Sequence, residues 1–150
     1  MDRLTPEQRS FVMSRIRGVD TGPEMQVRRA LHALGYRFRL HGRVDRRLWP
    51  TGRLPGKPDL VFAGRRKVIH INGCFWHRHA RCGRAARLPS SNRRFWRDKF
   101  ERNRRRGIRD RSRLHRAGWR YRTVWECDLA RDPEGQIARL VAFLEDDPAG

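Results

Sequence analysis

Residues 59–71 read DLVFAGRRKVIHI, in which two apolar runs, Asp59–Ala63 and Val68–Ile71, are separated by Gly64-Arg65-Arg66. Short runs rich in β-branched and aromatic residues, joined by a few residues that include glycine, are typical of a β-hairpin. We therefore predict two antiparallel strands here, within the central sheet of the protein.

The chain before this hairpin carries two helix starts. Thr5-Pro6-Glu7-Gln8 combines an N-cap residue, proline at the first helical position and glutamine at the capping-box position. A similar arrangement recurs at Thr21-Gly22-Pro23-Glu24, and Gly18 and Gly35 are the corresponding stop signals. The sequence thus predicts two short helices upstream of the sheet.

Between the second helix and the hairpin the pattern changes twice. Tyr36, Phe38 and Leu40 alternate with arginines, as in a half-buried strand. Residues 41–58 are rich in glycine, proline and arginine and predict a long loop. Residues 74–91, after the hairpin, are irregular as well.

Downstream, Asn92–Ala117 predicts a long arginine-rich helix that Gly107 could interrupt. Trp119–Trp125 predicts another strand, and Asp132-Pro133 begins a last amphipathic helix. The order of helix, helix, strands, helix, strand and helix predicts an α/β fold, with a central mixed sheet and flanking helices.

The length and charge of the chain narrow its class. A chain of 150 residues fits one domain, which we expect to span residues 1–150 with its core at about residues 8–145. The formal net charge is +20 and the isoelectric point about 11.7, so the partner should be a polyanion, with nucleic acid as the default. Nearly all of the positive charge is arginine, which grips phosphates and guanine edges in bidentate fashion. A GC-rich genome that replaces lysine by arginine would explain the same excess.

Nothing in the sequence predicts a membrane or secreted protein. The chain has no apolar run of about 18 residues, which a membrane span requires. Residues 1–10 lack the apolar segment of a secretory signal. We therefore expect a cytoplasmic protein in which thiols stay reduced, so its three cysteines suggest a metal site before a disulfide framework.

The cysteines fall into one metal-binding pattern. Cys74, His79 and Cys82 are spaced C-x4-H-x2-C, and Cys127 follows the last predicted strand. Three thiolates and one imidazole make a closed tetrahedral Zn²⁺ site, which is structural because no position remains open for water. The alternative is three buried thiols and a surface histidine.

A catalytic metal site is predicted less directly. Asp59 opens a strand, and Glu24 on the second helix could add a carboxylate; Mg²⁺ takes one or two protein oxygens with water and phosphate. The strand Val68–Ile71 offers no further acid or lysine, so Mg²⁺ would need other oxygens, such as a main-chain carbonyl. His77 is a candidate general base at neutral pH. The alternatives are a surface aspartate at a turn and a polar loop histidine.

Aromatic and basic residues predict contacts with DNA. Phe75 and Trp76 are adjacent in a basic loop, and Trp96 begins the arginine-rich helix, so these rings could be wedges between base steps or ordinary core residues. The run Arg93–Arg116 holds eleven arginines, which on a helix could neutralise several phosphates.

Taken together, the segment Asn72–His79, NGCFWHRH, resembles the G-C-F-W-H-x-H segment of very short patch repair (Vsr) endonucleases. The resemblance extends over roughly residues 8–145 in five ordered blocks. The other blocks are Arg9-Ser10…Met13…Ile16 with Asp20-Thr21…Glu24…Arg28, Pro55-Gly56-Lys57-Pro58-Asp59, Phe95-Trp96…Lys99…Asn103, and Gly118-Trp119-Arg120…Val124-Trp125-Glu126-Cys127.

The resemblance implies a restriction-endonuclease-like fold and an enzyme that nicks duplex DNA on the 5′ side of the thymine in a T·G mismatch, formed when 5-methylcytosine deaminates. It implies catalytic Mg²⁺ held by Asp59 and the backbone carbonyl of Ile71, with His77 as general base and Glu24 as a supporting acid. It also implies DNA contacts through Phe75, Trp76, Trp96, Lys99 and Asn103, and structural Zn²⁺ on Cys74, His79, Cys82 and Cys127. A monomer is expected, with the mismatch-repair matchmaker MutL as a partner.

The chain also departs from the family pattern. Asn72 stands where members often have histidine, and Gly107 stands where the family's long helix often has aspartate. Asp110 could replace that aspartate beside His77. Two rival functions follow: a non-catalytic, zinc-stapled module that binds mismatched or bent DNA, and a restriction-type nuclease that cuts fully paired DNA.

Overall fold

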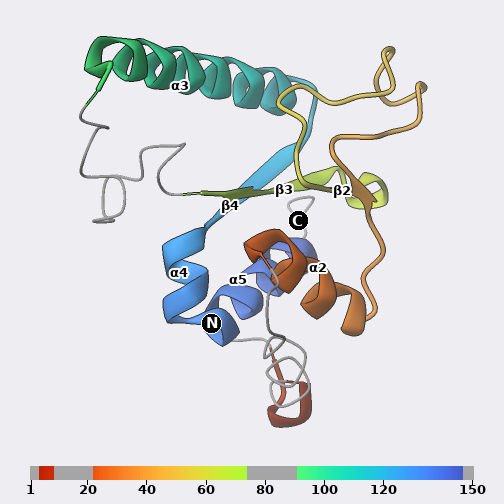
Figure 1. Ribbon diagram of the computed structural model, residues 1–150. Coiled ribbons are helices and arrows are strands. Elements are labelled where there is room, and N and C mark those ends of the chain that lie inside the picture. Colours follow the sequence, from red (N-terminus) through yellow and green to blue (C-terminus); the bar gives the residue numbers. More distant parts are fainter. Residues whose placement is uncertain (1–3, 9–21, 74–90, 147–150) are drawn as a thin grey trace.

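The computed structural model describes residues 4–8, 22–73 and 91–146. Within these ranges, helices lie on both sides of a four-stranded sheet (Figure 1). The elements in chain order are α2 (Pro23–Ala33), β1 (Arg39–Leu40), β2 (Leu60–Phe62), the 3-10 turn η1 (Ala63–Arg65), β3 (Lys67–Asn72), α3 (Arg93–Arg116), β4 (Arg120–Trp125), α4 (Glu126–Arg131) and α5 (Pro133–Glu145).

The sheet is mixed, with strand order β1-β2-β3-β4. The predicted hairpin is confirmed: β2 and β3 are antiparallel, with Leu60 opposite Ile69 and Val61 opposite Val68. β1 adds to β2 in the antiparallel sense, whereas β3 and β4 are parallel. Parallel neighbours need a long crossover, and α3 lies within that connection. The predicted α/β arrangement of a mixed sheet with flanking helices is therefore confirmed.

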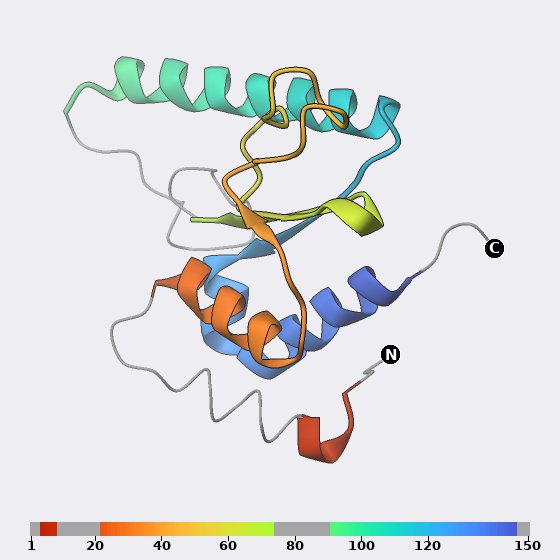
Figure 2. The same ribbon diagram turned by 90° about the vertical axis from the view of Figure 1, so that its right-hand side faces the viewer.

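One face of the sheet is covered by α2, α4 and α5 (Figure 2). The continuous core on this side includes Leu31 of α2, Ile69 of β3 and Leu140 of α5, each at most 1% exposed. Burying one such side chain contributes about 1.5–3 kcal/mol. Because this core anchors α2 against the sheet, the first turn of α2, which carries Glu24, is held beside the start of β2.

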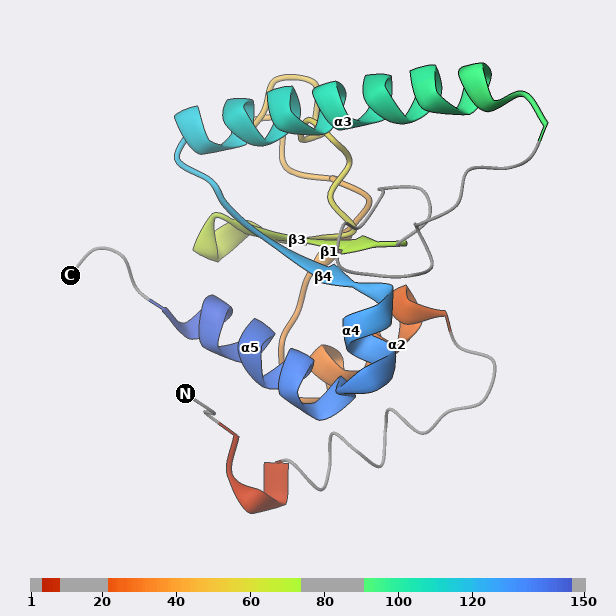
Figure 3. The same ribbon diagram turned by 90° about the vertical axis from the view of Figure 1, so that its left-hand side faces the viewer.

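The opposite face is covered by the C-terminal half of α3 and by residues 41–58 (Figure 3). A second, smaller core lies there, made of Val44, Leu54, Val61, Val68, Leu114 and Trp119. The guanidinium of Arg113 lies 5.6 Å from the ring centre of Trp49, which fastens the loop to α3. A cleft of about 1180 Å³ lies above β3 and β4 and is lined by α3 residues between Arg97 and Arg111.

Local signals at the helix ends are borne out where the structure describes them. The backbone N–H of Thr5 donates to Gln8 Oε1 at 2.9 Å, and that of Gln8 donates to Thr5 Oγ1 at 3.1 Å, which is the predicted capping box. Pro23 occupies the first turn of α2, and Gly35 takes φ +98° just beyond its end. The remainder of the first predicted helix, with Gly18, lies outside the described residues.

The observed elements differ from the sequence analysis, or go beyond it, in three places. The long helix α3 runs unbroken through Gly107, because one glycine costs only about 1 kcal/mol in a long run of good helix formers. The predicted strand at Tyr36–Leu40 is reduced to its last two residues, since Tyr36 and Phe38 direct their rings onto Phe62. The short helix α4 was not predicted. No helix in the described ranges is both long enough and apolar enough to span a bilayer.

Candidate active site

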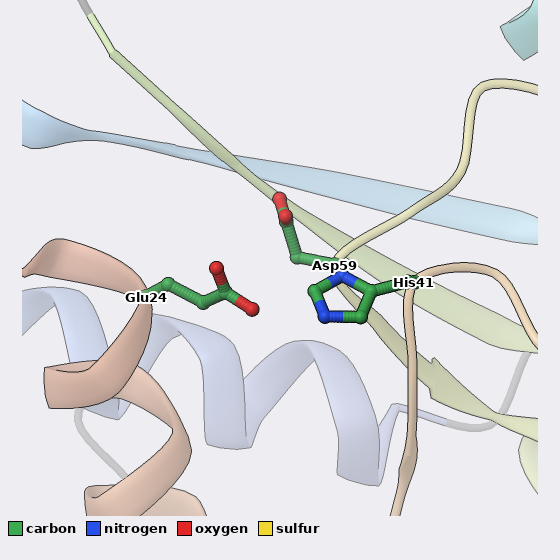
Figure 4. A group of neighbouring side chains, drawn as sticks. All are labelled: Glu24, His41 and Asp59. Atoms are coloured by element: carbon green, nitrogen blue, oxygen red, sulfur yellow. The ribbon is translucent and has the colours of Figure 1, made fainter.

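Three side chains with metal-binding atoms converge at the start of β2: Glu24, His41 and Asp59 (Figure 4). One potential ligand atom from each lies within 4.8 Å of the others. Glu24 comes from the first turn of α2, His41 from the residue after β1, and Asp59 from the residue before β2. The site is therefore assembled by tertiary structure, since its members are far apart in the sequence.

Asp59 is fixed by the backbone around it. Its Oδ2 accepts a hydrogen bond of 2.7 Å from the N–H of Ile71, and its backbone carbonyl accepts one of 3.1 Å from the N–H of His41. Burial raises the pKa of Asp59 above its usual value; the hydrogen bond from Ile71 lowers it, and the neighbouring charge of Glu24 raises it further. A bound cation would favour the ionised form that burial and Glu24 oppose.

One carboxylate oxygen of Glu24 lacks a hydrogen-bond donor among the described residues. Its Oε1 is buried and accepts no hydrogen bond from any described residue, and the guanidinium of Arg28 approaches it only to 3.9 Å. A buried carboxylate oxygen without a hydrogen bond is costly unless a cation or water satisfies it. This orphaned atom, aimed at the same space as Asp59, fits a divalent cation bound through oxygen ligands.

Ile71 lies in β3 at the same edge. Its N–H points at Asp59, and the N–H and C=O of one strand residue point toward the same neighbouring strand. The carbonyl of Ile71 therefore faces the side of β3 on which Asp59 lies. The structure thus brings together Glu24, Asp59 and Ile71, the three residues that the sequence analysis assigned to a Mg²⁺ site.

Most of the other predicted site residues cannot be placed. Cys74, Phe75, Trp76, His77, His79 and Cys82 lie outside the described residues. Cys127 is described, half-buried in the first turn of α4. Asn72 and Trp125 are register partners at the ends of the parallel strands β3 and β4. Cys74 and Cys127 thus each follow, by two residues, strand positions that lie side by side.

The predicted DNA-contacting residues of α3 form a separate group at its N-terminal half. The ring of Trp96 stacks at a tilt on Phe100, with ring centres 5.7 Å apart, and Lys99 Nζ lies 5.5 Å from the centre of the Trp96 ring. Phe95 beside them is 54% exposed. Asn103 lines the cleft above the sheet.

The two departures from the family pattern lie in the same cleft. Asn72 and Gly107 both line it, and so does Asp110. A Cβ placed on Gly56 would lie 3.3 Å from that of Asp110, so α3 packs at this point against the loop that leads to Asp59.

His41 was missed by sequence reasoning, which assigned it to a loop. The signal that reveals it is strand register. Arg39 faces Val61 and Leu40 faces Leu60, so the next pair in the same register is His41 and Asp59. Finding it required pairing β1 with β2 across a loop of 17 intervening residues, 42–58, which no local pattern predicts.

Comparisons with known proteins point to one family of DNA endonucleases. The family model of the DNA mismatch endonuclease Vsr matches residues 1–84. The "Type II nicking enzyme V.XorIIP" of Xanthomonas oryzae pv. oryzae is 46% identical over 144 residues, 96% of this chain and 97% of that protein. The "Type II nicking enzyme V.NmeAIP" of Neisseria meningitidis is 35% identical, covering 97% of each chain. The "DNA mismatch endonuclease Vsr" of Escherichia coli is 38% identical over 81% of this chain and 70% of its own length.

Proposed function

The chain belongs to the Vsr family of DNA endonucleases, and we propose that it nicks duplex DNA on the 5′ side of the thymine in a T·G mismatch. The proposed reaction is Mg²⁺-dependent hydrolysis of one phosphodiester bond, leaving 3′-hydroxyl and 5′-phosphate ends. The family and the relatives named as nicking enzymes support cleavage of DNA. The mismatch and the metal are our proposals.

The observation that carries the proposal is the convergence of Glu24 and Asp59, with one oxygen of Glu24 buried and without a hydrogen bond. Asp59, held by the N–H of Ile71, and the carbonyl of Ile71 would bind Mg²⁺, with Glu24 as the supporting acid. When bound, the cation supplies charge stabilisation for the attacked phosphate and the leaving oxygen. The chain's own part is to fix these oxygens at one edge of the sheet before DNA arrives.

His77 is proposed to accept the proton of the attacking water. A histidine with a pKa near neutrality suits this task, and His77 lies in the segment that follows β3. Structural Zn²⁺ on Cys74, His79, Cys82 and Cys127 is proposed to hold that segment against the sheet. The register partnership of Asn72 with Trp125 supports the pairing of Cys74 and Cys127 in one site.

The proposed DNA surface includes the cleft below α3. Arg97 and Arg106 line this cleft together with Asn103, whereas Arg102 and Arg109 are exposed on α3 outside it. Guanidinium groups beside a cleft can pair with phosphates on both sides of a bound backbone. Phe75, Trp76 and Trp96 are proposed to insert at the mismatch, with Lys99 beside Trp96. A partnership with MutL rests on the family resemblance alone.

The test is single-turnover nicking of end-labelled duplexes that differ only at one base pair, T·G or T·A, with Mg²⁺ or with no divalent cation. We expect Mg²⁺-dependent nicking beside the mismatched thymine by the parent protein and none by Asp59→Ala. Asp146→Ala is the matched control, because the exposed carboxylate of Asp146 pairs with Arg120, and its backbone carbonyl accepts from Lys67 at the opposite end of β3 from Ile71.

The outcomes separate the rival functions. Equal nicking of T·A duplex would replace mismatch repair by a restriction-type activity. Tight binding without nicking, in the parent protein and with every metal, would identify a recognition module. Nicking by Asp59→Ala at the parent rate would remove the proposed metal site.

A further inference from the structure

His41 is turned toward the carboxylates by an unusual backbone. Its φ is +57°, in the left-handed region that only a few per cent of residues other than glycine adopt, with asparagine, aspartate and histidine enriched among them. Such a conformation costs about 1–3 kcal/mol and persists only where the surrounding structure enforces it. Residues held in this way cluster at functional sites, and His41 faces Asp59 (Figure 4).

The loop around His41 enforces this conformation. The backbone N–H of His41 donates to the carbonyl of Asp59 at 3.1 Å. The following residue, Gly42, has φ +74°, and a Cβ on it would lie 3.0 Å from Cα of Lys57 and 3.2 Å from Cδ of Pro58. The two ends of residues 41–58 are thus packed backbone to backbone, which fixes the backbone of His41 beside the site while its side chain stays exposed at the mouth of the group.

The imidazole adds a different kind of donor to the site. Glu24 and Asp59 offer oxygen, whereas His41 offers a ring nitrogen, and the three lie within 4.8 Å of one another. Opposite ligands of a six-coordinate Mg²⁺ lie about 4.2 Å apart, so the group is only slightly wider than a filled site. Carboxylate and carbonyl oxygens suit both Mg²⁺ and Mn²⁺, whereas an imidazole nitrogen is a ligand for transition-metal ions and a poor one for Mg²⁺, so adding it shifts the preference of the site from Mg²⁺ toward Mn²⁺.

We propose that His41 is a nitrogen ligand of the divalent cation held by Glu24 and Asp59, and that this ligand makes the site bind Mn²⁺ in preference to Mg²⁺. The inference rests on the proposed function only in taking the Glu24–Asp59 pair as the cation site. It goes further by adding a ligand and a metal preference that oxygen ligands alone would not give.

The test is Mn²⁺ binding to the full-length protein without DNA, followed by electron paramagnetic resonance. Mn²⁺ leaves thiolate sites to softer metals, so the proposed zinc ligands do not compete. A bound imidazole nitrogen gives a ¹⁴N modulation in the pulsed experiment, which oxygen ligands do not. Competition by Mg²⁺ in the same titration gives the relative affinity of the two ions.

The variants are His41→Asn and His41→Gly, because asparagine and glycine both tolerate the left-handed backbone at this position. We expect each to remove the ¹⁴N signal and to raise the Mn²⁺ dissociation constant at least about tenfold, with a smaller change for Mg²⁺. His32→Ala is the matched control, since His32 is exposed at the other end of α2 from Glu24. It should leave both affinities unchanged. His77→Ala tests whether the histidine proposed as general base supplies the nitrogen instead.

Each outcome bears on one claim. A ¹⁴N signal that survives both His41 variants, or is lost only in His77→Ala, overturns the assignment to His41. Unchanged Mn²⁺ affinity in the His41 variants, with loss of binding in Asp59→Asn, also overturns it but leaves the carboxylate site standing. Mn²⁺ binding that is unaffected by Asp59→Asn would instead refute the proposed function's metal site.

Discussion

The carboxylate of Asp59, in the acidic site at the start of β2, and the carboxylate of Glu101, on helix α3, have opposite electrostatic surroundings. On α3, Glu101 is hydrogen-bonded by Arg104 and Arg105 at 2.9–3.2 Å, and these bonds lower its pKa to about 2. At the site, burial raises the pKa of Asp59. In a chain with a net charge of +20, arginine was available for both places. The Glu101 carboxylate pairs with arginines and stabilises the helix, whereas the Asp59 carboxylate, hydrogen-bonded by a backbone N–H, remains able to bind a metal ion.

The largest effect expected from this difference is on catalysis. Glu24→Gln and Glu101→Gln make the same chemical change on two helices, and both keep the size of the side chain. We expect Glu24→Gln to slow single-turnover nicking about 10–100-fold, because it removes a charge that supports the metal site. Glu101→Gln should change the rate less than about threefold, since Glu101 lies outside the metal site and exposed ion pairs contribute little.

Rates at saturating duplex, measured against Mg²⁺ concentration, check this prediction. The loss in Glu24→Gln should be partly recovered at high Mg²⁺ if the change weakens metal binding. Equal losses of nicking rate in the two variants would show that the Glu24 carboxylate contributes no more to catalysis than the Glu101 carboxylate does.

The second effect is on stability and has opposite signs in the two regions. The folded-state pKa of Asp59 lies above its ordinary value of 3.8, so the folded protein binds more protons than the unfolded chain between the two values. Stability contributed by this group is therefore lost as the pH rises through that interval. Without added divalent cation, Asp59→Asn should melt at a higher temperature than the parent protein at pH 7, and the advantage should shrink as the pH falls toward 3.8.

Glu101 gives the reverse behaviour. Its folded-state pKa of about 2 lies below the ordinary 4.5, so its contribution is complete above pH 4.5 and is lost as the pH falls toward 2. Glu101→Gln should therefore melt slightly below the parent protein at pH 7, with the gap closing in acid.

Mg²⁺ should raise the melting temperature of the parent protein but not that of Asp59→Asn, because only a folded site binds it. A destabilised Asp59→Asn at pH 7 would contradict the assigned cause of the raised pKa.

The same two regions show what sequence alone can predict. Helix α3, the hairpin of β2 and β3, and the start of α2 follow from local signals: a run of helix formers, two apolar runs around a glycine, and a proline at the first turn. These features need no knowledge of distant residues, so they were predicted with nearly correct bounds. The six-residue α4 was missed because so short a helix leaves no periodic pattern.

The site was predictable only in part, because it is assembled from distant segments. Asp59 and Glu24 were identified as candidates, mainly through the family motifs that contain them. His41 has no motif, and its partner Asp59 is reached only through the register of β1 with β2. Pairing across a long loop depends on which strands meet, and that is decided by the shared core and not by the loop's own sequence.

The smallest expected effect tests how far α3 depends on local structure alone. Gly107 sits in the middle of this unbroken helix with an ordinary helical backbone, and the atoms nearest to a Cβ there belong to the guanidinium of Arg111, with Nη1 at 3.1 Å. Because that atom is the far end of a flexible side chain, it can move aside. Gly107→Ala should then raise the free energy of unfolding by about 0.5–1 kcal/mol, measured by denaturant titration. Ser112→Ala, at an exposed position of the same helix, should give a smaller gain. A loss of stability in Gly107→Ala would show that Arg111 is held in place by the cleft it lines, and α3 would then be shaped by tertiary contacts much as the acidic site is.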